Sequence, residues 1–257
     1  MATAFITKNN IKMEQLLAKE NIIGIIGGAG PDATELLYKN IIELARTKYG
    51  AHRLEQYPSL LIGSFPVLQD INNDKELDQV IESLCDSADK LKIAGAKHLC
   101  FACNTHHLAI DVVRKHVGLP FISMVDLVQN KIKNEGYKSV AVIGTSYTLD
   151  QALYAKPLKS LGVEIIELLP ELAKKSHTII GEALAGIPSE LTKEYVNFIK
   201  EVENTAEFDA LILGCTEYSV LEYRRKLESY PTKLPIVDPL IELSLEIARM
   251  YYEESSG

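Results

Sequence analysis

The fold is decided by two stretches, Phe101-Ala102-Cys103-Asn104-Thr105 and Leu213-Gly214-Cys215-Thr216-Glu217. Each places a cysteine directly after an apolar run and follows it with small hydroxyl, amide or acidic residues. The apolar runs, 98–102 and 210–214, are typical of buried strands in a parallel sheet. Because ligands bind beyond the carboxyl ends of such strands, we expect both thiols to face a cleft.

The rest of the chain alternates strand and helix patterns. Working outward from the cysteine runs, we expect strands over 22–26, 59–64, 119–123, 139–143, 163–168 and 234–238. The helices are expected over about 32–49 (opened by Asp32 or Thr34), 74–94, 106–117, 149–161, 170–204 (more than one helix), 218–228 and 239–252. The sequence therefore predicts an α/β protein.

The two halves of the chain repeat one another at low sequence similarity. The segment Leu119–Asp126 resembles Leu234–Asp238, and each follows a cysteine strand and its helix. Such internal repetition predicts two similar α/β domains with mainly parallel sheets, related by a pseudo-two-fold axis. Each domain would bring one cysteine loop to a shared cleft, where we expect the active site.

The composition limits the classes of partner and the location. The 257 residues are 47% hydrophobic and 24% charged, as in ordinary soluble proteins. A net charge of −8 argues against a nucleic-acid partner, although backbone N–H groups at helix starts still bind anionic ligands. No apolar run approaches the roughly 20 residues of a membrane helix, and residues 1–20 lack a signal-peptide core. We expect a cytoplasmic protein with no membrane partner and a small-molecule substrate.

The remaining cysteines and the glycine turn do not indicate a metal or a cofactor. Cys85 lies on a predicted helix face and Cys100 inside a predicted strand, so both are expected in the core. Cys100 and Cys103 have the Cys-x-x-Cys spacing of a zinc site, but the sequence has no second pair of ligands at a usual spacing. The turn Gly27-Gly28-Ala29-Gly30 lacks the Gly-x-Gly-x-x-Gly spacing of dinucleotide sites. No phosphate loop with a Schiff-base lysine stands out for pyridoxal phosphate.

Two thiols on opposite sides of one carbon favour a reaction that removes a proton from one face and returns it to the other. A lone cysteine at a strand end is usually a small buried residue, but two at matched ends favour catalysis. One thiol must begin as thiolate and the other as thiol. Asn104, Thr105 and Thr216 supply donors that can hold a carboxylate, and His107 and Glu217 lie where they can tune the thiols.

Four motifs carry a resemblance to a known family. They are Ile25-Ile26-Gly27-Gly28-Ala29-Gly30-Pro31 with Ala33-Thr34, Cys103-Asn104-Thr105-His106-His107, Gly214-Cys215-Thr216-Glu217 and Pro235-Ile236-Val237-Asp238-Pro239. With them the chain resembles the aspartate/glutamate racemase family of cofactor-independent racemases over about residues 21–250. Glu217 stands where cell-wall glutamate racemases usually carry histidine, which favours the aspartate racemase branch.

The resemblance implies residue roles, an assembly and domain boundaries. It implies that Cys103 and Cys215 are the two acid/bases and that the substrate-binding residues are Ala29, Asn104, Thr105, Thr145, Thr148, Thr216 and Glu217. It also implies a homodimer. The first domain would cover 1–120 plus 227–257, with 1–20 as an N-terminal extension, and the second domain 121–226.

Two departures from the family pattern concern the substrate side chain. Aspartate racemases carry an arginine shortly after the second strand, where this chain reads Phe65-Pro66-Val67-Leu68-Gln69-Asp70-Ile71. They often carry a lysine two positions before a glycine, where this chain has Leu184 before Gly186. Lys174 or Lys175 is the candidate substitute; otherwise the pocket takes an amino acid without a distal carboxylate.

Two other functions compete with an amino-acid racemase. One is a related isomerase or decarboxylase of small dicarboxylic acids. The other is a non-catalytic protein that binds amino acids in the same cleft, although such a protein has no chemical need for two thiols.

Overall fold

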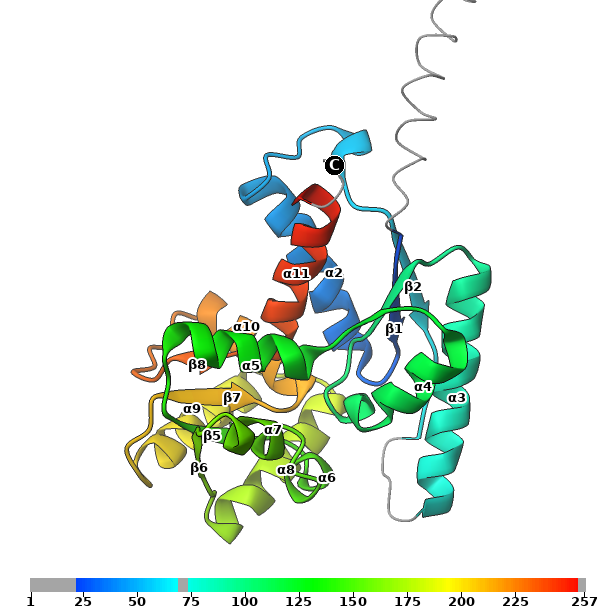
Figure 1. Cartoon of the computed structure of the whole chain (residues 1–257). Helices are drawn as coiled ribbons and strands as arrows, with labels where there is room; N and C mark the ends of the chain where they lie inside the picture. Colours follow the sequence, from blue (N-terminus) through cyan, green and yellow to red (C-terminus); the bar gives the residue numbers. More distant parts are fainter. Residues whose placement is uncertain (1–21, 69–73, 254–257) are drawn as a thin grey trace, which may run out of the picture.

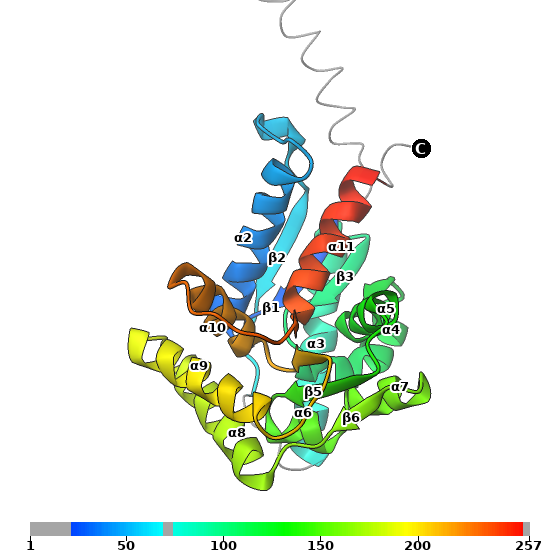
Figure 2. The ribbon, with the colours of Figure 1, turned by 90° about the vertical axis from the view of Figure 1, so that its left-hand side faces the viewer.

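The structure, a computed structural model, consists of two lobes, each built on a four-stranded parallel sheet. It describes residues 22–68 and 74–253, so the extension expected over 1–20 lies outside the described residues. Figure 2, turned by 90°, shows the first sheet above the second, with helices beside both.

The first sheet has the strand order β2-β1-β3-β4. Its strands are β1 (Ile23–Gly27), β2 (Leu60–Ser64), β3 (His98–Phe101) and β4 (Phe121–Ile122). Its helical segments are α2 (Pro31–Thr47), η1 (Leu54–Gln56), α3 (Asp74–Ile93), η2 (Thr105–Ala109) and α4 (Ile110–Val117). All five residues of β1 are buried because helices cover both faces: Ile25 packs in the cluster with α2, and Ile26 in the cluster with α3 and α4.

The second sheet repeats this arrangement in the order β6-β5-β7-β8. Its strands are β5 (Ser139–Ile143), β6 (Glu164–Ile166), β7 (Ala210–Leu213) and β8 (Ile236–Val237). The helices are α5 (Met124–Glu135), α6 (Ser146–Asp150), α7 (Ala155–Ser160), α8 (Pro170–Leu184), α9 (Ser189–Glu203) and α10 (Thr216–Leu227). The identical order of strands in the two sheets confirms the predicted duplication.

The last helix, α11 (Pro239–Glu253), connects the two lobes. It follows β8 of the second sheet but packs against α2 of the first lobe and against α5, and it lies beside α2 in Figure 1. Leu240, Leu243 and Ile247 share a buried cluster with Ile23 and Ile25 of β1. The domain boundaries, 1–120 plus 227–257 and 121–226, stay a prediction.

Four helical segments differ from the expectation. The helix expected over 149–161 is broken into α6 and α7, because Ala152 adopts a left-handed φ of +53° that ends the first turn. The helix expected over 106–117 begins as the tighter η2, and α5 was not expected at all. The sequence of α10 is rich in polar and charged residues, which indicates an exposed helix, yet α10 is largely buried, and its Glu222 and Arg225 form an ion pair of 2.6 Å inside the protein.

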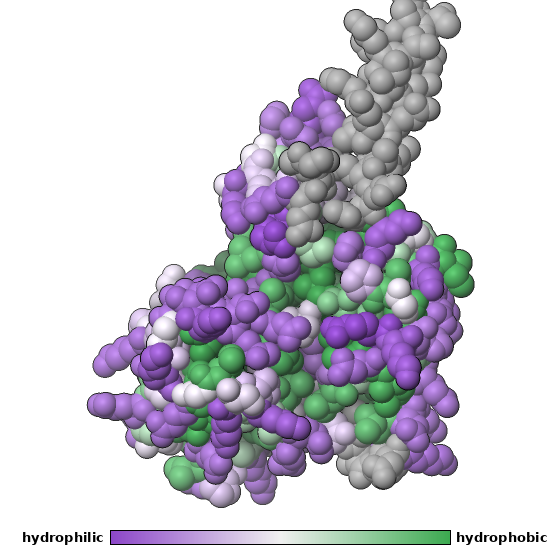
Figure 3. Space-filling view, in the orientation of Figure 1, coloured by the Kyte–Doolittle hydropathy of each residue, from purple (hydrophilic) through white to green (hydrophobic). Residues whose placement is uncertain are grey.

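None of the helices within 22–68 and 74–253 combines the length and the apolar character needed to cross a bilayer. On the face shown in Figure 3, hydrophobic surface lies in patches among hydrophilic residues.

Candidate active site

The two cysteines occupy equivalent positions in the two lobes. Cys103 lies two residues beyond the end of β3, and Cys215 lies two residues beyond the end of β7, where it caps the amino end of α10. They are close enough that a negative charge on Cys103 raises the pKa of Cys215. The structure therefore brings together the two thiols that the sequence placed at strand ends.

Cys103 is surrounded by hydrogen-bond donors. The backbone N–H groups of His106 and Thr105 and the Thr105 hydroxyl donate to its sulfur, which favours the thiolate. Burial opposes them, and together with the charge of Glu217 it raises the pKa of Cys103 to about 12. Burial thus disfavours the Cys103 thiolate, whereas the three donors favour it.

Cys215 has the opposite kind of neighbour. Its thiol, only 6% exposed, donates to Oε2 of Glu217 at 2.8 Å, and Thr216 Oγ1 donates to the same oxygen at 3.4 Å. Burial, followed by the charge of Glu217, raises the pKa of Cys215, and the Glu217 backbone N–H opposes this in part. An adjacent carboxylate that accepts the S–H favours the protonated thiol.

The glycine turn of the first lobe lies against the same carboxylate. Gly30 has a φ of +94° and precedes α2, and a Cβ atom on it would come within 2.3 Å of Oε1 of Glu217. Only glycine fits this backbone conformation and this approach. Half-buried Ala29 lies in the same turn, beside the Gly28 N–H that donates to Thr34 Oγ1 at 3.3 Å.

Asn104 presents one half of its amide to the site. Its Oδ1 accepts a hydrogen bond from the Tyr154 hydroxyl of the second lobe. The side chain is 1% exposed, and no described residue accepts a hydrogen bond from its buried Nδ2. A buried donor in this state is suited to an anionic oxygen of a ligand.

Three threonines join the two lobes beside Asn104. The hydroxyls of Thr105 and Thr148 lie 3.0 Å apart, and Thr145 Oγ1 donates to Thr148 Oγ1 at 3.0 Å. Thr145 also caps α6, because its hydroxyl accepts from the Thr148 backbone N–H at 3.1 Å. The candidate residues from the second lobe therefore lie against those that follow Cys103.

The structure corrects the expectation for His107. Its Nδ1 donates to the Cys103 carbonyl oxygen at 2.9 Å, and its Nε2 accepts from the Met124 backbone N–H at 3.0 Å. Burial lowers its pKa to about 4, so it is neutral and engaged at both nitrogens. His107 holds the backbone of the cysteine loop and does not contact the thiol through its ring.

Three supporting residues were missed in the sequence because no local motif marks them. One is Tyr154, described above. The others are Ser176 of α8, whose hydroxyl donates to the Gly144 carbonyl at 2.8 Å and accepts from its N–H at 3.2 Å, and Tyr218, whose hydroxyl donates to Ser176 Oγ at 2.9 Å. Ser176 and Tyr218 together hold the backbone immediately before Thr145.

The two cations missing from the family pattern are not replaced by Lys175. Its Nζ binds both carboxylate oxygens of Glu201, at 2.8 and 2.9 Å. Lys174 is exposed, and Leu184 is the last residue of α8 and 37% exposed. The segment Gln69–Ile71, part of the stretch without the expected arginine, lies outside the described residues.

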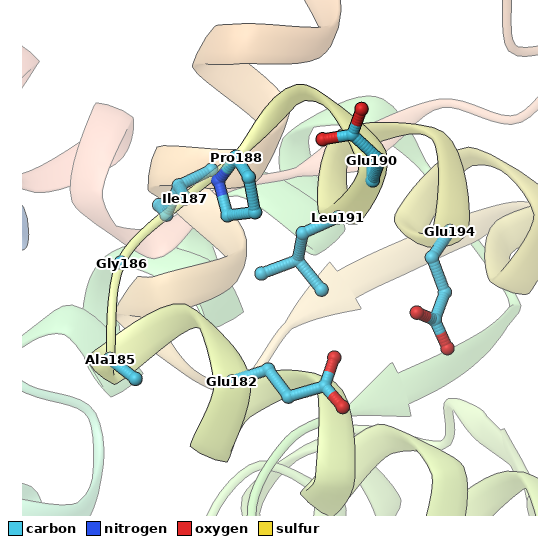
Figure 4. Close-up of a pocket in the computed structure, with 8 residues that line it drawn as sticks. All are labelled: Glu182, Ala185, Gly186, Ile187, Pro188, Glu190, Leu191 and Glu194. Carbon is cyan, nitrogen blue, oxygen red and sulfur yellow. The ribbon is translucent and has the colours of Figure 1, made fainter.

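A hollow of about 650 Å³ lies at the turn between α8 and α9 (Figure 4). Figure 4 shows Leu191 inside it and Glu190 pointing away from the carboxylates of Glu182 and Glu194. Its charged lining residues are all acidic, and neither Cys103 nor Cys215 lines it. An anionic ligand is therefore disfavoured there.

Within the described residues, no three His, Cys, Asp or Glu side chains are grouped to hold a metal ion.

Comparisons with known proteins agree with this geometry. Residues 26–243 match the family model described as Asp/Glu/Hydantoin racemase. The chain is 25% identical over 222 residues to the broad specificity amino-acid racemase RacX of Bacillus subtilis (strain 168), covering 84% of this chain and 92% of that protein.

Two solved structures are similar. An aspartate racemase homologue from Pyrococcus horikoshii OT3 superposes with a TM-score of 0.72 at 28% identity, covering 91% of this chain and all of that one. A mutant of arylmalonate decarboxylase superposes with a TM-score of 0.54 at 17% identity, covering 91% and 93%, which shows a shared fold alone. By its family match and its paired strand-end cysteines, the chain belongs to the Asp/Glu/hydantoin racemase family.

Proposed function

We propose that this protein is an amino-acid racemase that inverts the α-carbon with two thiols, Cys103 and Cys215, and without a cofactor. The observation that carries the proposal is the opposite hydrogen bonding of the two sulfurs. Cys103 accepts from three donors, whereas Cys215 donates to Glu217. This asymmetry matches a reaction in which Cys103 is the sulfur that loses its proton and acts as the base, while Cys215 keeps its proton and acts as the acid.

The proposed reaction moves one proton from the α-carbon onto Cys103 and another from Cys215 onto the α-carbon. The Cys103 thiolate takes the α-hydrogen, and the bond's electron pair spreads onto the substrate carboxylate. Cys215 then delivers its own proton to the opposite face of the carbon. The two sulfurs finish in exchanged states, and the next turnover in the reverse sense restores them.

The substrate is held through its carboxylate and its ammonium group. Asn104 Nδ2 is the proposed free donor to the carboxylate, and the hydroxyls of Thr105, Thr145, Thr148 and Thr216 are proposed to turn from their present acceptors to donate to it when the substrate binds. Such preorganised donors stabilise the charge that develops on it in the transition state. The Glu217 carboxylate is the proposed acceptor for the ammonium group. Ala29, in the adjacent turn, is proposed to line the same part of the site.

We propose that the preferred side chain is not strictly that of aspartate. Leu184 replaces the family lysine, and Lys175 is engaged by Glu201. A distal carboxylate would therefore lack these partners, whereas a neutral side chain needs none. The similarity to a racemase named for broad specificity supports the same preference.

Proton NMR in D2O tests the proposal. Purified protein under reducing conditions is incubated with single amino acids, aspartate and glutamate first and then a neutral and basic panel. We expect loss of the α-hydrogen signal for neutral amino acids. Turnover of small dicarboxylic acids alone would instead indicate an isomerase or decarboxylase, and binding without any exchange would indicate a non-catalytic protein.

Cysteine variants test the mechanism. Cys103→Ala and Cys215→Ala should each abolish racemisation in both directions. Cys85→Ala, on α3 and away from both strand ends, is the matched control and should keep the activity. Racemisation at the wild-type rate in either active-site variant would rule out the two-thiol mechanism.

We also propose a homodimer in the cytoplasm, as the family resemblance implies. Light scattering on the purified full chain tests the assembly. A mass of twice the 28.5 kDa of the chain is expected, and a single-chain mass at all concentrations would contradict it.

A further inference from the structure

We infer that Tyr154 is a positioning residue that fixes the Asn104 amide so that its Nδ2 faces the substrate carboxylate. The inference rests on the proposed racemase function and deepens it. It is carried by one contact between the lobes, the hydrogen bond from the Tyr154 hydroxyl to Asn104 Oδ1.

The two residues reach each other from different sheets. Asn104 follows β3 of the first sheet, and Tyr154 precedes α7, which follows β5 of the second. The Tyr154 ring, 1% exposed, packs in the core of the second lobe with Val142, Leu158 and Ile212. The ring is therefore anchored in one lobe, while its hydroxyl sets the orientation of a side chain in the other.

The chemistry of an amide makes this orientation decisive. An asparagine side chain offers an acceptor at Oδ1 and two donors at Nδ2, and a rotation of 180° exchanges them. Burial raises the pKa of Tyr154 well above its usual value, so the phenol keeps its proton and remains a donor. A donor at this place binds Oδ1 and leaves Nδ2 turned the other way. The opposite orientation would present a carbonyl oxygen to a carboxylate and repel it.

The backbone just before Tyr154 has an unusual conformation, which places the Tyr154 hydroxyl within reach of Asn104. Ala152, two residues earlier, has a left-handed φ of +53° that an alanine rarely adopts. This conformation separates α6 from α7, and without the break Tyr154 would continue the helix that begins at Ser146. Backbone strain that persists in a folded protein commonly supports a functional placement.

Asn104 itself shows that something is to be bound. Its Nδ2 is buried and, across residues 22–68 and 74–253, finds no acceptor. A donor left in that state is costly to the folded protein. A substrate carboxylate would satisfy it, provided that Tyr154 keeps the amide from turning.

Tyr154→Phe tests the inference, since it keeps the ring and removes only the hydroxyl. In α-hydrogen exchange we expect KM to rise about tenfold or more, as for loss of a hydrogen bond to a charged group, with a smaller change in kcat. Tyr195→Phe is the matched control. Its buried hydroxyl donates to Glu222 at 3.2 Å in the interior of the second lobe, so its loss should leave KM unchanged.

A double-mutant cycle separates positioning from general support of the fold. If Tyr154 acts through Asn104, Tyr154→Phe should change KM less than twofold in an Asn104→Ala background. Equal fold-changes in both backgrounds would overturn the inference, because they would mean that the hydroxyl acts independently of the amide.

NMR of the wild-type protein keeps the inference testable even if Tyr154→Phe does not fold. The Asn104 Nδ2 protons, assigned by their loss in Asn104→Ala, should shift when an exchanging amino acid is added. No shift at saturation would overturn the inference. Wild-type protein that exchanges no amino acid would overturn both proposals, whereas an active wild type with an unchanged KM in Tyr154→Phe would overturn only this one.

Discussion

The contact between Gly30 and Glu217 allows a sharp test of how the lobes hold the active site. In Gly30→Ala, the new Cβ would lie 2.3 Å from Glu217 Oε1, and the backbone would keep a φ of +94°. A left-handed alanine costs roughly 1–2 kcal/mol. Moving the carboxylate away also breaks its hydrogen bond with the Cys215 thiol, about 1.5–3 kcal/mol for a charged partner. We therefore expect a loss of roughly 2.5–5 kcal/mol in unfolding free energy.

Gly50→Ala provides the matched control. Gly50 also has a left-handed φ, of +70°, but a Cβ atom on it would meet no neighbouring group within 4 Å. Its substitution should cost only the backbone part, roughly 1–2 kcal/mol. Both variants change the unfolded chain in the same way, so the difference between them isolates the collision with Glu217.

Urea unfolding followed by far-UV circular dichroism measures both costs, because the chain contains no tryptophan for a fluorescence assay. In a Glu217→Ala background, the cost of Gly30→Ala should fall to that of Gly50→Ala, since no carboxylate remains to be displaced. A Gly30→Ala cost no larger than that of Gly50→Ala, or one that is unchanged by Glu217→Ala, would refute the reasoning.

Three further predictions concern pH and backbone strain. Burial lowers the pKa of His106 and His107 to about 4, so the folded state binds fewer protons than the unfolded state between about pH 6.5 and 4. The free energy of unfolding that the neutral histidines contribute is therefore fully present above pH 6.5 and is lost as the pH falls through this window, by roughly 3 kcal/mol per histidine. A urea midpoint that stays constant from pH 7 to 4.5 would contradict this. Because the pKa of Cys103 is raised to about 12, kcat/KM for α-hydrogen exchange should rise with pH from 7 to 9, by up to about tenfold per unit; a flat profile would show that thiolate formation does not limit the rate. Ala152→Gly should raise the unfolding free energy by up to about 1 kcal/mol, because glycine adopts the left-handed φ without strain, and a lower melting temperature would argue against it.

The strands and both thiols could be predicted because their signals are local. A continuous apolar run such as 139–143 has one stable place, inside a covered parallel sheet, and it forms β5 with the expected bounds. The position of each cysteine directly after such a run then determines its place at a strand end. The same reasoning predicted that Asn104, Thr105 and Thr216 lie beside the thiols, because each follows a cysteine directly or within two residues.

The remaining features depend on contacts between distant segments. Nothing near Ala152 indicates a left-handed alanine, so the break between α6 and α7 was not foreseen. The spacing of Glu222 and Arg225 is that of an exposed helix pair, yet Glu222 is 1% exposed and also accepts from the Tyr195 hydroxyl. For His107, the residue type suggested chemistry, whereas its ring partners, which only the fold supplies, make it structural.

The unequal surroundings of the two thiols have a kinetic consequence for a racemase. Enantiomers of an amino acid have the same free energy in water, so the equilibrium constant of the reaction is one. By the Haldane relation, kcat/KM must then be equal for the two directions, whatever the environments of Cys103 and Cys215. The three donors at Cys103 and the carboxylate at Cys215 can therefore make kcat and KM differ between the two directions, but they cannot make the ratio kcat/KM differ. The enantiomer that turns over faster must also be the one that saturates the enzyme at higher concentration.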